Sequence, residues 1–157
     1  MNNPNLNTET SSDSKTRAVD LLLEKYAESH QNPLNEWIHF VCVPVIVWTV
    51  LGLLWVIHPM LAGGALTAAL IYYASLSAAF AVGMGLMSVI MLGILLLLPH
   101  DKVLPVALAV FVLAWVGQFI GHKIEGKKPS FVDDLRFLLI GPLFVLGFLY
   151  RRLKIAY

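Results

Sequence analysis

Histidine, glutamate and asparagine side chains are concentrated in two short polar stretches of an otherwise apolar chain. The first stretch carries His30, Asn35 and His39, and the second carries His122 and Glu125. If both are helical, Asn35 and His39 share one helix face, as do His122 and Glu125, because residues three or four apart are neighbours on a helix. Imidazole nitrogens and a carboxylate oxygen suit Zn(II) or Fe(II), and an ion with open positions can do chemistry. The two stretches predict a metal site if the fold brings them together.

Simpler interpretations compete with a metal site. A single histidine at a membrane interface is usually a wet, hydrogen-bonded side chain, and Glu125 can be a solvated charge paired weakly with Lys127 or Lys128. The single cysteine, Cys42, lies in an apolar run and is expected to be a packing residue. One cysteine excludes an internal disulfide and a cysteine-based zinc site.

The composition indicates a membrane protein. The 157 residues are 58% hydrophobic and only 13% charged, whereas soluble domains average about 45–50% apolar and about 25% charged residues. The net charge of +1 and the lack of a basic face with interleaved aromatic residues set nucleic-acid binding aside.

Hydropathy predicts an all-α bundle with four membrane spans, at about 38–57, 61–81, 84–98 and 103–120. The forty residues from Met60 to Pro99 carry no charge. As one helix they would measure roughly 60 Å, twice the hydrocarbon core of a bilayer. They must fold back, and the glycines of "VGMG" at 82–85 predict the break.

Shorter elements are expected at both ends of this bundle. Residues 1–14 predict a disordered tail and 15–157 a single membrane domain. An amphipathic helix from Ser14 to His30 should end before Pro33, and Asn32 should cap the next helix. The segment 137–150, with Gly141-Pro142 inside it, is short for a span and predicts a re-entrant or interfacial helix.

Charge sets the orientation. With four spans, ten of the eleven Lys and Arg residues lie on one side, and only Lys102 lies opposite. The positive-inside rule places that side, with the N-terminus, in the cytoplasm. We expect a multi-pass protein of a bacterial inner membrane, or of the endoplasmic reticulum in a eukaryote. His30, His39 and His122 then share the cytoplasmic face, while His58 and His100 lie on the other.

The same residues carry a family resemblance. The pattern Tyr26-x3-His30-x2-Pro33-x-Asn35-x3-His39-x4-Pro44 resembles the N-terminal signature of the 2-hydroxy fatty acid dioxygenase family. The stretch "WVGQFIGHKIEGKKPSFVDD" at 115–134 resembles that family's Gly-His…Glu…Pro block, and "LIGPLF" follows at 139–144. The resemblance covers about residues 20 to 150.

This resemblance implies an integral-membrane, Fe(II)-dependent dioxygenase that uses O2 to remove one carbon from a 2-hydroxy fatty acid. It implies iron ligands at His30, His39 and His122, and Glu125 is the further candidate ligand. Tyr26 and Asn35 are expected to orient ligands or an oxygen intermediate.

The basic residues beside the second stretch have two interpretations. The simplest interpretation is that they are positive-inside residues that contact anionic lipid headgroups; these residues are Lys123, Lys128 and Arg136. In a more specific interpretation, one of them holds the substrate carboxylate.

Two other functions stay open. A zinc-dependent membrane hydrolase would use the same ligands. A non-catalytic transporter or scaffold would use the small residues of the spans for close helix packing. The spans lack a midplane charge, which argues against ion coupling. Whether the chain forms a homo-oligomer is also left open.

Overall fold

The computed structural model describes residues 10–28, 30–126 and 137–157. Those residues form helices joined by short turns, with no strand among them. The order is α1 (Thr10–Ala27), α2 (Pro33–Ile57), α3 (Pro59–Leu76), α4 (Ala78–Leu96), α5 (His100–Glu125), the 3-10 turn η1 (Phe137–Leu139) and α7 (Ile140–Leu153). The predicted all-α membrane bundle is confirmed.

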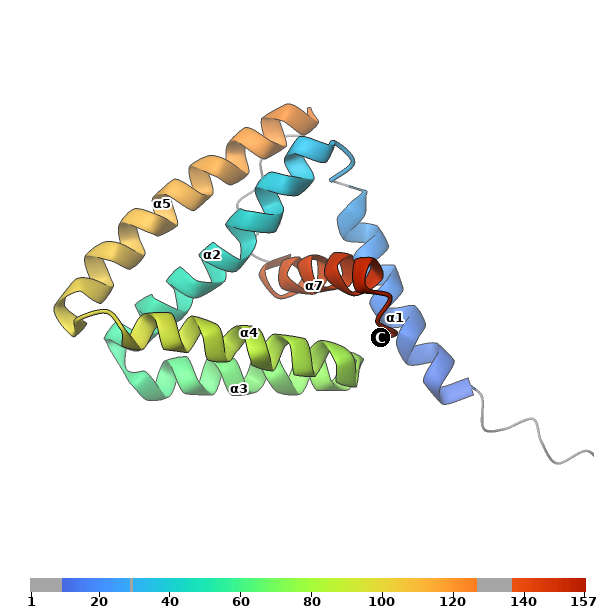
Figure 1. Ribbon diagram of the computed structural model, residues 1–157, viewed down its shortest axis with the longest axis horizontal. Coiled ribbons are helices and arrows are strands. Elements are labelled where there is room, and N and C mark those ends of the chain that lie inside the picture. The colour runs from blue at the N-terminus through green and yellow to red at the C-terminus, as the bar shows by residue number, and fades with distance from the viewer. Residues whose placement is uncertain (1–9, 29, 127–136) are drawn as a thin grey trace, which may run out of the picture.

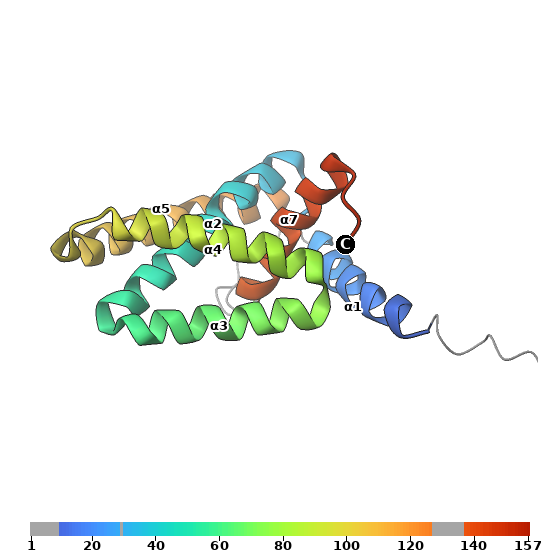
Figure 2. The same cartoon turned by 60° about the horizontal axis from the view of Figure 1, so that its bottom comes forward.

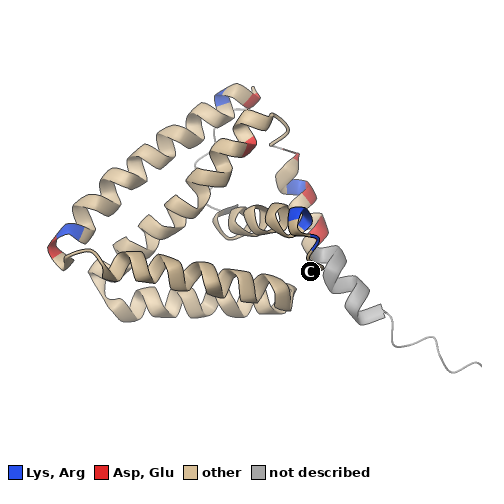
Figure 3. Cartoon of the chain, in the orientation of Figure 1, with Lys and Arg blue, Asp and Glu red and all other residues tan. Residues whose placement is uncertain are grey.

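Four of these helices, α2 to α5, are long and apolar enough to cross a membrane. Their outer faces carry large exposed apolar side chains, such as Val82 at 73% and Leu113 at 70% of full exposure. Such surfaces are unfavourable in water and suit contact with lipid. The charged side chains lie at helix ends and on the α1 and α7 side, and α3 and α4 carry none (Figure 3).

The chain runs through the bundle as two antiparallel helix pairs. In Figure 1, α2 lies beside α5 along one edge and α3 lies beside α4 along another. The α2–α3 and α4–α5 turns meet at one corner, so the start of α2 and the end of α5 lie together at the other end of their edge. This arrangement brings together the two polar stretches from opposite ends of the sequence.

The predicted break between the second and third spans was wrong. The turn lies at Ser77, whose backbone is extended, and Gly83 and Gly85 lie inside α4. A Cβ at Gly83 would run into the hydroxyl of Tyr150 on α7, and that hydroxyl donates to the Ala79 carbonyl at 2.7 Å. Gly83 is therefore explained by close packing of α7 rather than by a turn.

The two ends of the chain pack on each other. Val19, Leu23 and Tyr26 of α1 are buried in one cluster with Leu143 and Phe144 of α7. The apolar side of α1 thus lies on protein, and Figures 1 and 2 both show α1 beside α7. Helix α1 begins at Thr10, within the predicted tail. Helix α7 is not among the candidate spans, and its residues from Gly141 to Gly147 are buried.

Glycines on α5 allow it to approach α2 closely. A Cβ at Gly117 would lie 2.8 Å from Cys42 Sγ, and one at Gly121 would collide with the Asn35 side-chain oxygen. Gly117 and Gly121 are four residues apart and face the same partner helix, which is the small-xxx-small pattern of tightly packed membrane helices.

We predict that Gly117→Ala lowers the stability of the folded bundle by about 1–3 kcal/mol, because the added methyl group overpacks the α2–α5 contact. Unfolding in detergent measures the change. The matched control is Gly93→Ala, where a Cβ meets nothing within 4 Å. Adding Cys42→Ala should restore stability to Gly117→Ala. Equal unfolding of Gly117→Ala and Gly93→Ala would show that the contact is not tight.

Candidate functional site

Three histidine rings lie together where the end of α1, the first turns of α2 and the last turn of α5 meet. The ring centroids are 4.1 Å apart for His30 and His39, 5.0 Å for His39 and His122, and 5.9 Å for His30 and His122. All three side chains are buried, with 7%, 2% and 5% of their surface exposed. The grouping predicted from hydropathy alone is therefore present in the fold.

Backbone carbonyls fix the orientation of two of these rings. His30 Nδ1 donates to the Tyr26 carbonyl at 2.8 Å, and His39 Nδ1 donates to the Asn35 carbonyl at 3.0 Å. A carbonyl only accepts, so Nδ1 carries the proton in each ring, and in a neutral imidazole Nε2 then holds the lone pair. This is the tautomer in which histidine binds a metal through Nε2, with its other nitrogen held by an outer hydrogen bond.

His39 is the best candidate for a ligand. Its Nε2 is buried and has no hydrogen-bond partner among the described residues. A buried acceptor without a partner costs free energy. A metal ion or a donating ligand at this nitrogen would remove that cost.

Tyr26 supports the cluster from α1. Its ring stacks on His30 with centroids 4.2 Å apart and an angle of 7° between the planes. Phe144 of α7 packs beside both rings, with its centroid 5.0 Å from that of Tyr26 and 6.1 Å from that of His30. The predicted neighbourhood of Tyr26 is thus present, and its predicted part in catalysis stays a prediction.

Glu125 ties the end of α5 to the start of α2. Its two carboxylate oxygens accept from the backbone N–H groups of Gln31 and Asn32 and from Asn35 Nδ2, each at 2.9 Å. Backbone N–H groups at the start of a helix attract negative charge. The Asn32 side chain also accepts from Leu34 N at 2.9 Å, which confirms the predicted cap of α2. A metal contact by Glu125 stays a prediction.

The basic candidates are less closely tied to the site. Lys123 is exposed on the last turn of α5, and Lys128 and Arg136 lie outside the described residues. The two remaining histidines begin helices at the opposite corner of the bundle. His58 Nδ1 there accepts from Met60 N at 3.2 Å, so this ring caps α3.

Gln118 is a site residue that the sequence reasoning missed. It is 4% exposed, and its Oε1 has no hydrogen-bond partner among the described residues. It lines a small pocket of about 20 Å³ together with His39 and Tyr26, and that is room for about one water molecule. The sequence does contain a signal for this residue. Burying a single amide in an apolar span costs free energy, so an amide one helical turn before His122 indicates a functional role.

No group of three or more His, Cys, Asp or Glu side chains in residues 10–28, 30–126 and 137–157 has the geometry of a metal site. The donor set nevertheless suits an ion such as Fe(II) or Zn(II), because it combines three buried imidazoles with the Nε2 of His39, which has no hydrogen-bond partner among those residues. Metal binding would require the rings to adjust around an ion.

We predict that Glu125→Gln destabilises the protein by about 1–2 kcal/mol, because the neutral amide weakens the hydrogen bonds at the start of α2. Thermal unfolding in detergent measures this loss. Glu36→Gln removes the same charge from the first turn of α2 and should cost less, since it tests only the helix dipole. If both variants unfold at the wild-type temperature, Glu125 does not hold the two helices together.

Comparison with known proteins identifies the family of the chain. A family model described as "2-hydroxy-palmitic acid dioxygenase Mpo1-like" matches residues 17–153, which include both polar stretches and α7. No curated protein and no solved structure matches the chain. Since the matched region covers most of the sequence, the chain belongs to the 2-hydroxy-palmitic acid dioxygenase Mpo1-like family.

Proposed function

We propose that this protein is an Fe(II)-dependent dioxygenase that shortens 2-hydroxy fatty acids by one carbon. The observation that carries the proposal is the buried cluster of His30, His39 and His122, in a chain whose family is described by a dioxygenase activity. Its partners are the 2-hydroxy fatty acid, O2 and the surrounding lipid.

The three histidines are the residues that would hold the iron. Bound Fe(II) would supply the O2 chemistry and leave positions open for the substrate. The hydrogen bonds from His30 Nδ1 and His39 Nδ1 to backbone carbonyls favour the tautomer whose Nε2 can bind a metal. The Nε2 of His39, which has no hydrogen-bond partner in the part of the chain that the structure describes, supports ligand binding from this ring in particular.

The remaining residues of the site hold the histidines in place. The Glu125 carboxylate accepts a hydrogen bond from Asn35 Nδ2 and so fixes the first turn of α2. The backbone carbonyl of Asn35 in turn accepts a hydrogen bond from His39 Nδ1 and fixes that ring. Tyr26 stacks on His30 and keeps its ring away from water. We assign Asn35 and Tyr26 to positioning, and we propose that one of Lys123, Lys128 and Arg136 binds the substrate carboxylate.

The reaction balances with one O2 per substrate. The bond between C1 and C2 of the 2-hydroxy acid breaks, C1 leaves as CO2, and C2 becomes the carboxyl carbon of the shortened acid. The two carbons together lose four electrons, which reduce O2, and one water molecule is formed. Oxygen uptake and CO2 release should therefore be equal.

We predict that His39→Asn abolishes iron binding and lowers turnover of 2-hydroxypalmitate by more than about 100-fold, because a ligand has been removed. Iron is measured by elemental analysis of anaerobically purified protein, and turnover by oxygen uptake. The matched control is His58→Asn, which keeps a good helix cap and should retain both. Full iron and full turnover in folded His39→Asn would refute the proposal, and zinc in the wild type would favour a hydrolase.

The membrane orientation is part of the proposal. With four spans, the sequence predicts that the start of α2 and the end of α5 share a side with ten of the eleven Lys and Arg residues, so the positive-inside rule assigns the site to the cytoplasmic face. Helix α7 is buried and is not a candidate span, so both termini should lie on that face.

We predict that a green fluorescent reporter fused after Tyr157 fluoresces as strongly as one fused to the N-terminus. A reporter fused after Lys102, which follows the third predicted crossing, should stay dark in a bacterial host. Darkness of the Tyr157 fusion would mean that the C-terminal segment crosses the membrane.

A further inference from the structure

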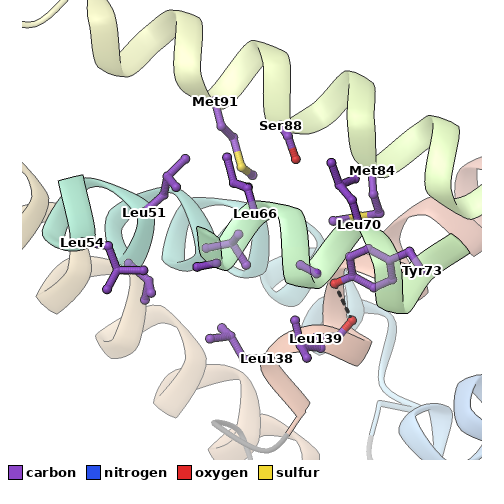
Figure 4. Close-up of a pocket in the computed structure, with 14 residues that line it drawn as sticks. Leu51, Leu54, Leu66, Leu70, Tyr73, Met84, Ser88, Met91, Leu138 and Leu139 are labelled. Carbon is purple, nitrogen blue, oxygen red and sulfur yellow. Dashed lines mark hydrogen bonds between the residues drawn. The ribbon is translucent and has the colours of Figure 1, made fainter. Parts of the chain in front are cut away.

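A second cavity, larger than the small pocket at the histidine cluster, lies between helices of the bundle. Its volume is about 150 Å³, and it lies between α2, α3, α4 and η1 (Figure 4). Its lining includes Leu51 and Leu54 of α2, Ala65 and Ala69 of α3, and Met91 of α4. A cavity of this size lined by aliphatic groups is large enough for a small apolar ligand.

The few polar atoms in this lining do not indicate a polar ligand. The Tyr73 hydroxyl donates to the Leu139 carbonyl at 2.9 Å, as the dashed line in Figure 4 shows. Ser88 is the other polar side chain of the lining. The remaining surface is aliphatic, so the ligand it favours is a hydrocarbon chain.

The cavity borders the small pocket of the histidine site at Leu138. This residue lines both the large cavity and the small pocket that contains His39 and Gln118. Along α2, His39, Val43 and Ile46 line the small pocket, and Val47, Val50, Leu51 and Leu54 continue along the large one. One face of α2 thus leads from the candidate iron ligands into an apolar space.

The length of this path suits a long acyl chain. His39 and Leu54 are fifteen residues apart on α2, which is roughly 22 Å of helix. A carbon–carbon bond of about 1.5 Å at a tetrahedral angle advances an extended chain by roughly 1.25 Å. The path is thus as long as an extended chain of about 16–18 carbon atoms, while the cavity of about 150 Å³ has room for only part of such a chain, because a space of that size takes a ligand such as benzene.

We propose that this cavity holds part of the alkyl chain of the 2-hydroxy acid, that Leu138 lies between the head group and this part of the chain, and that Ala69 limits how far the chain extends into the cavity. The proposal rests on the proposed function, because it places the head group at the histidines. Small side chains on α3 leave the space that the chain occupies. The same cavity would exclude polar head groups, which fixes the direction in which the substrate enters.

The test compares Ala69→Phe with Ala68→Phe. Ala68 is the next residue of α3, is exposed and does not line the cavity, so it controls for a large side chain on this helix. The ratio of kcat/KM for 2-hydroxypalmitate to that for 2-hydroxyoctanoate should fall about tenfold or more in Ala69→Phe, because the far methylenes lose their burial. It should stay at the wild-type value in Ala68→Phe.

A binding measurement separates this proposal from the proposed function. A 2-hydroxypalmitate with a diazirine near its methyl end should label residues of α2, α3 or α4 around the cavity, and excess 2-hydroxypalmitate should compete. Leu138→Trp, which places a larger side chain between the head group and the cavity, should reduce that labelling even if Ala69→Phe does not fold.

The outcomes distinguish a failure of the acyl-site proposal from a failure of the dioxygenase proposal. An unchanged chain-length ratio in active Ala69→Phe, or labelling confined to lipid-facing residues, overturns the cavity as the acyl site while the dioxygenase proposal stands. Specific labelling of the cavity without turnover in iron-loaded wild type supports the acyl site and refutes the dioxygenase. Competition by phospholipid rather than by free 2-hydroxypalmitate would assign the cavity to membrane lipid and overturn the proposal.

Discussion

The close contact between α2 and α5 is the constraint on which the site depends. Gly117 faces Cys42 and Gly121 faces Asn35 and His39, and a Cβ at either glycine would overlap its neighbour. Without this approach the rings of His39 and His122 could not lie 5.0 Å apart. In lipid there is little hydrophobic force between helices, so close van der Waals packing of small residues supplies the attraction. The glycines therefore act on the histidines only through the distance between two helix axes.

Glu125 and α7 complete what the glycines begin. The carboxylate of Glu125 hydrogen-bonds to the start of α2 and fixes how far along α5 that helix sits. From the other side, Gly141 of α7 lies so close to α2 that a Cβ there would be 2.8 Å from Val43 Cγ1. Tyr26 then fills the space between α7 and His30. Each support comes from a different part of the chain, which is why the candidate site needs nearly the whole sequence.

Hydropathy and charge were enough to predict the parts of the fold that solvation controls. The number of apolar helices, the cap at Asn32 and the separation of His30, His39 and His122 from His58 and His100 all follow from where polar residues interrupt apolar runs. Features that depend on three-dimensional packing were not predictable in this way. Glycine occurs both in turns and at close helix contacts, and the sequence does not distinguish the two. The turn between α3 and α4 was therefore predicted at Gly83, whereas it lies at Ser77. The cavity has no local sequence signature, because its lining comes from α2, α3, α4 and η1.

Helix α2 joins the surface proposed for the head group of the substrate to the surface proposed for its alkyl chain. Its first turns are polar and hold Asn35 and His39 against Glu125, and the same face continues downward as the aliphatic residues of the cavity. A 2-hydroxy acid has the same division, with two polar groups on adjacent carbons and a long apolar tail. A soluble enzyme must cover such a tail by folding over it. Under the proposed function, a helix that begins at the interface and continues through the bilayer would present both surfaces in the order in which the substrate needs them, without a separate lid.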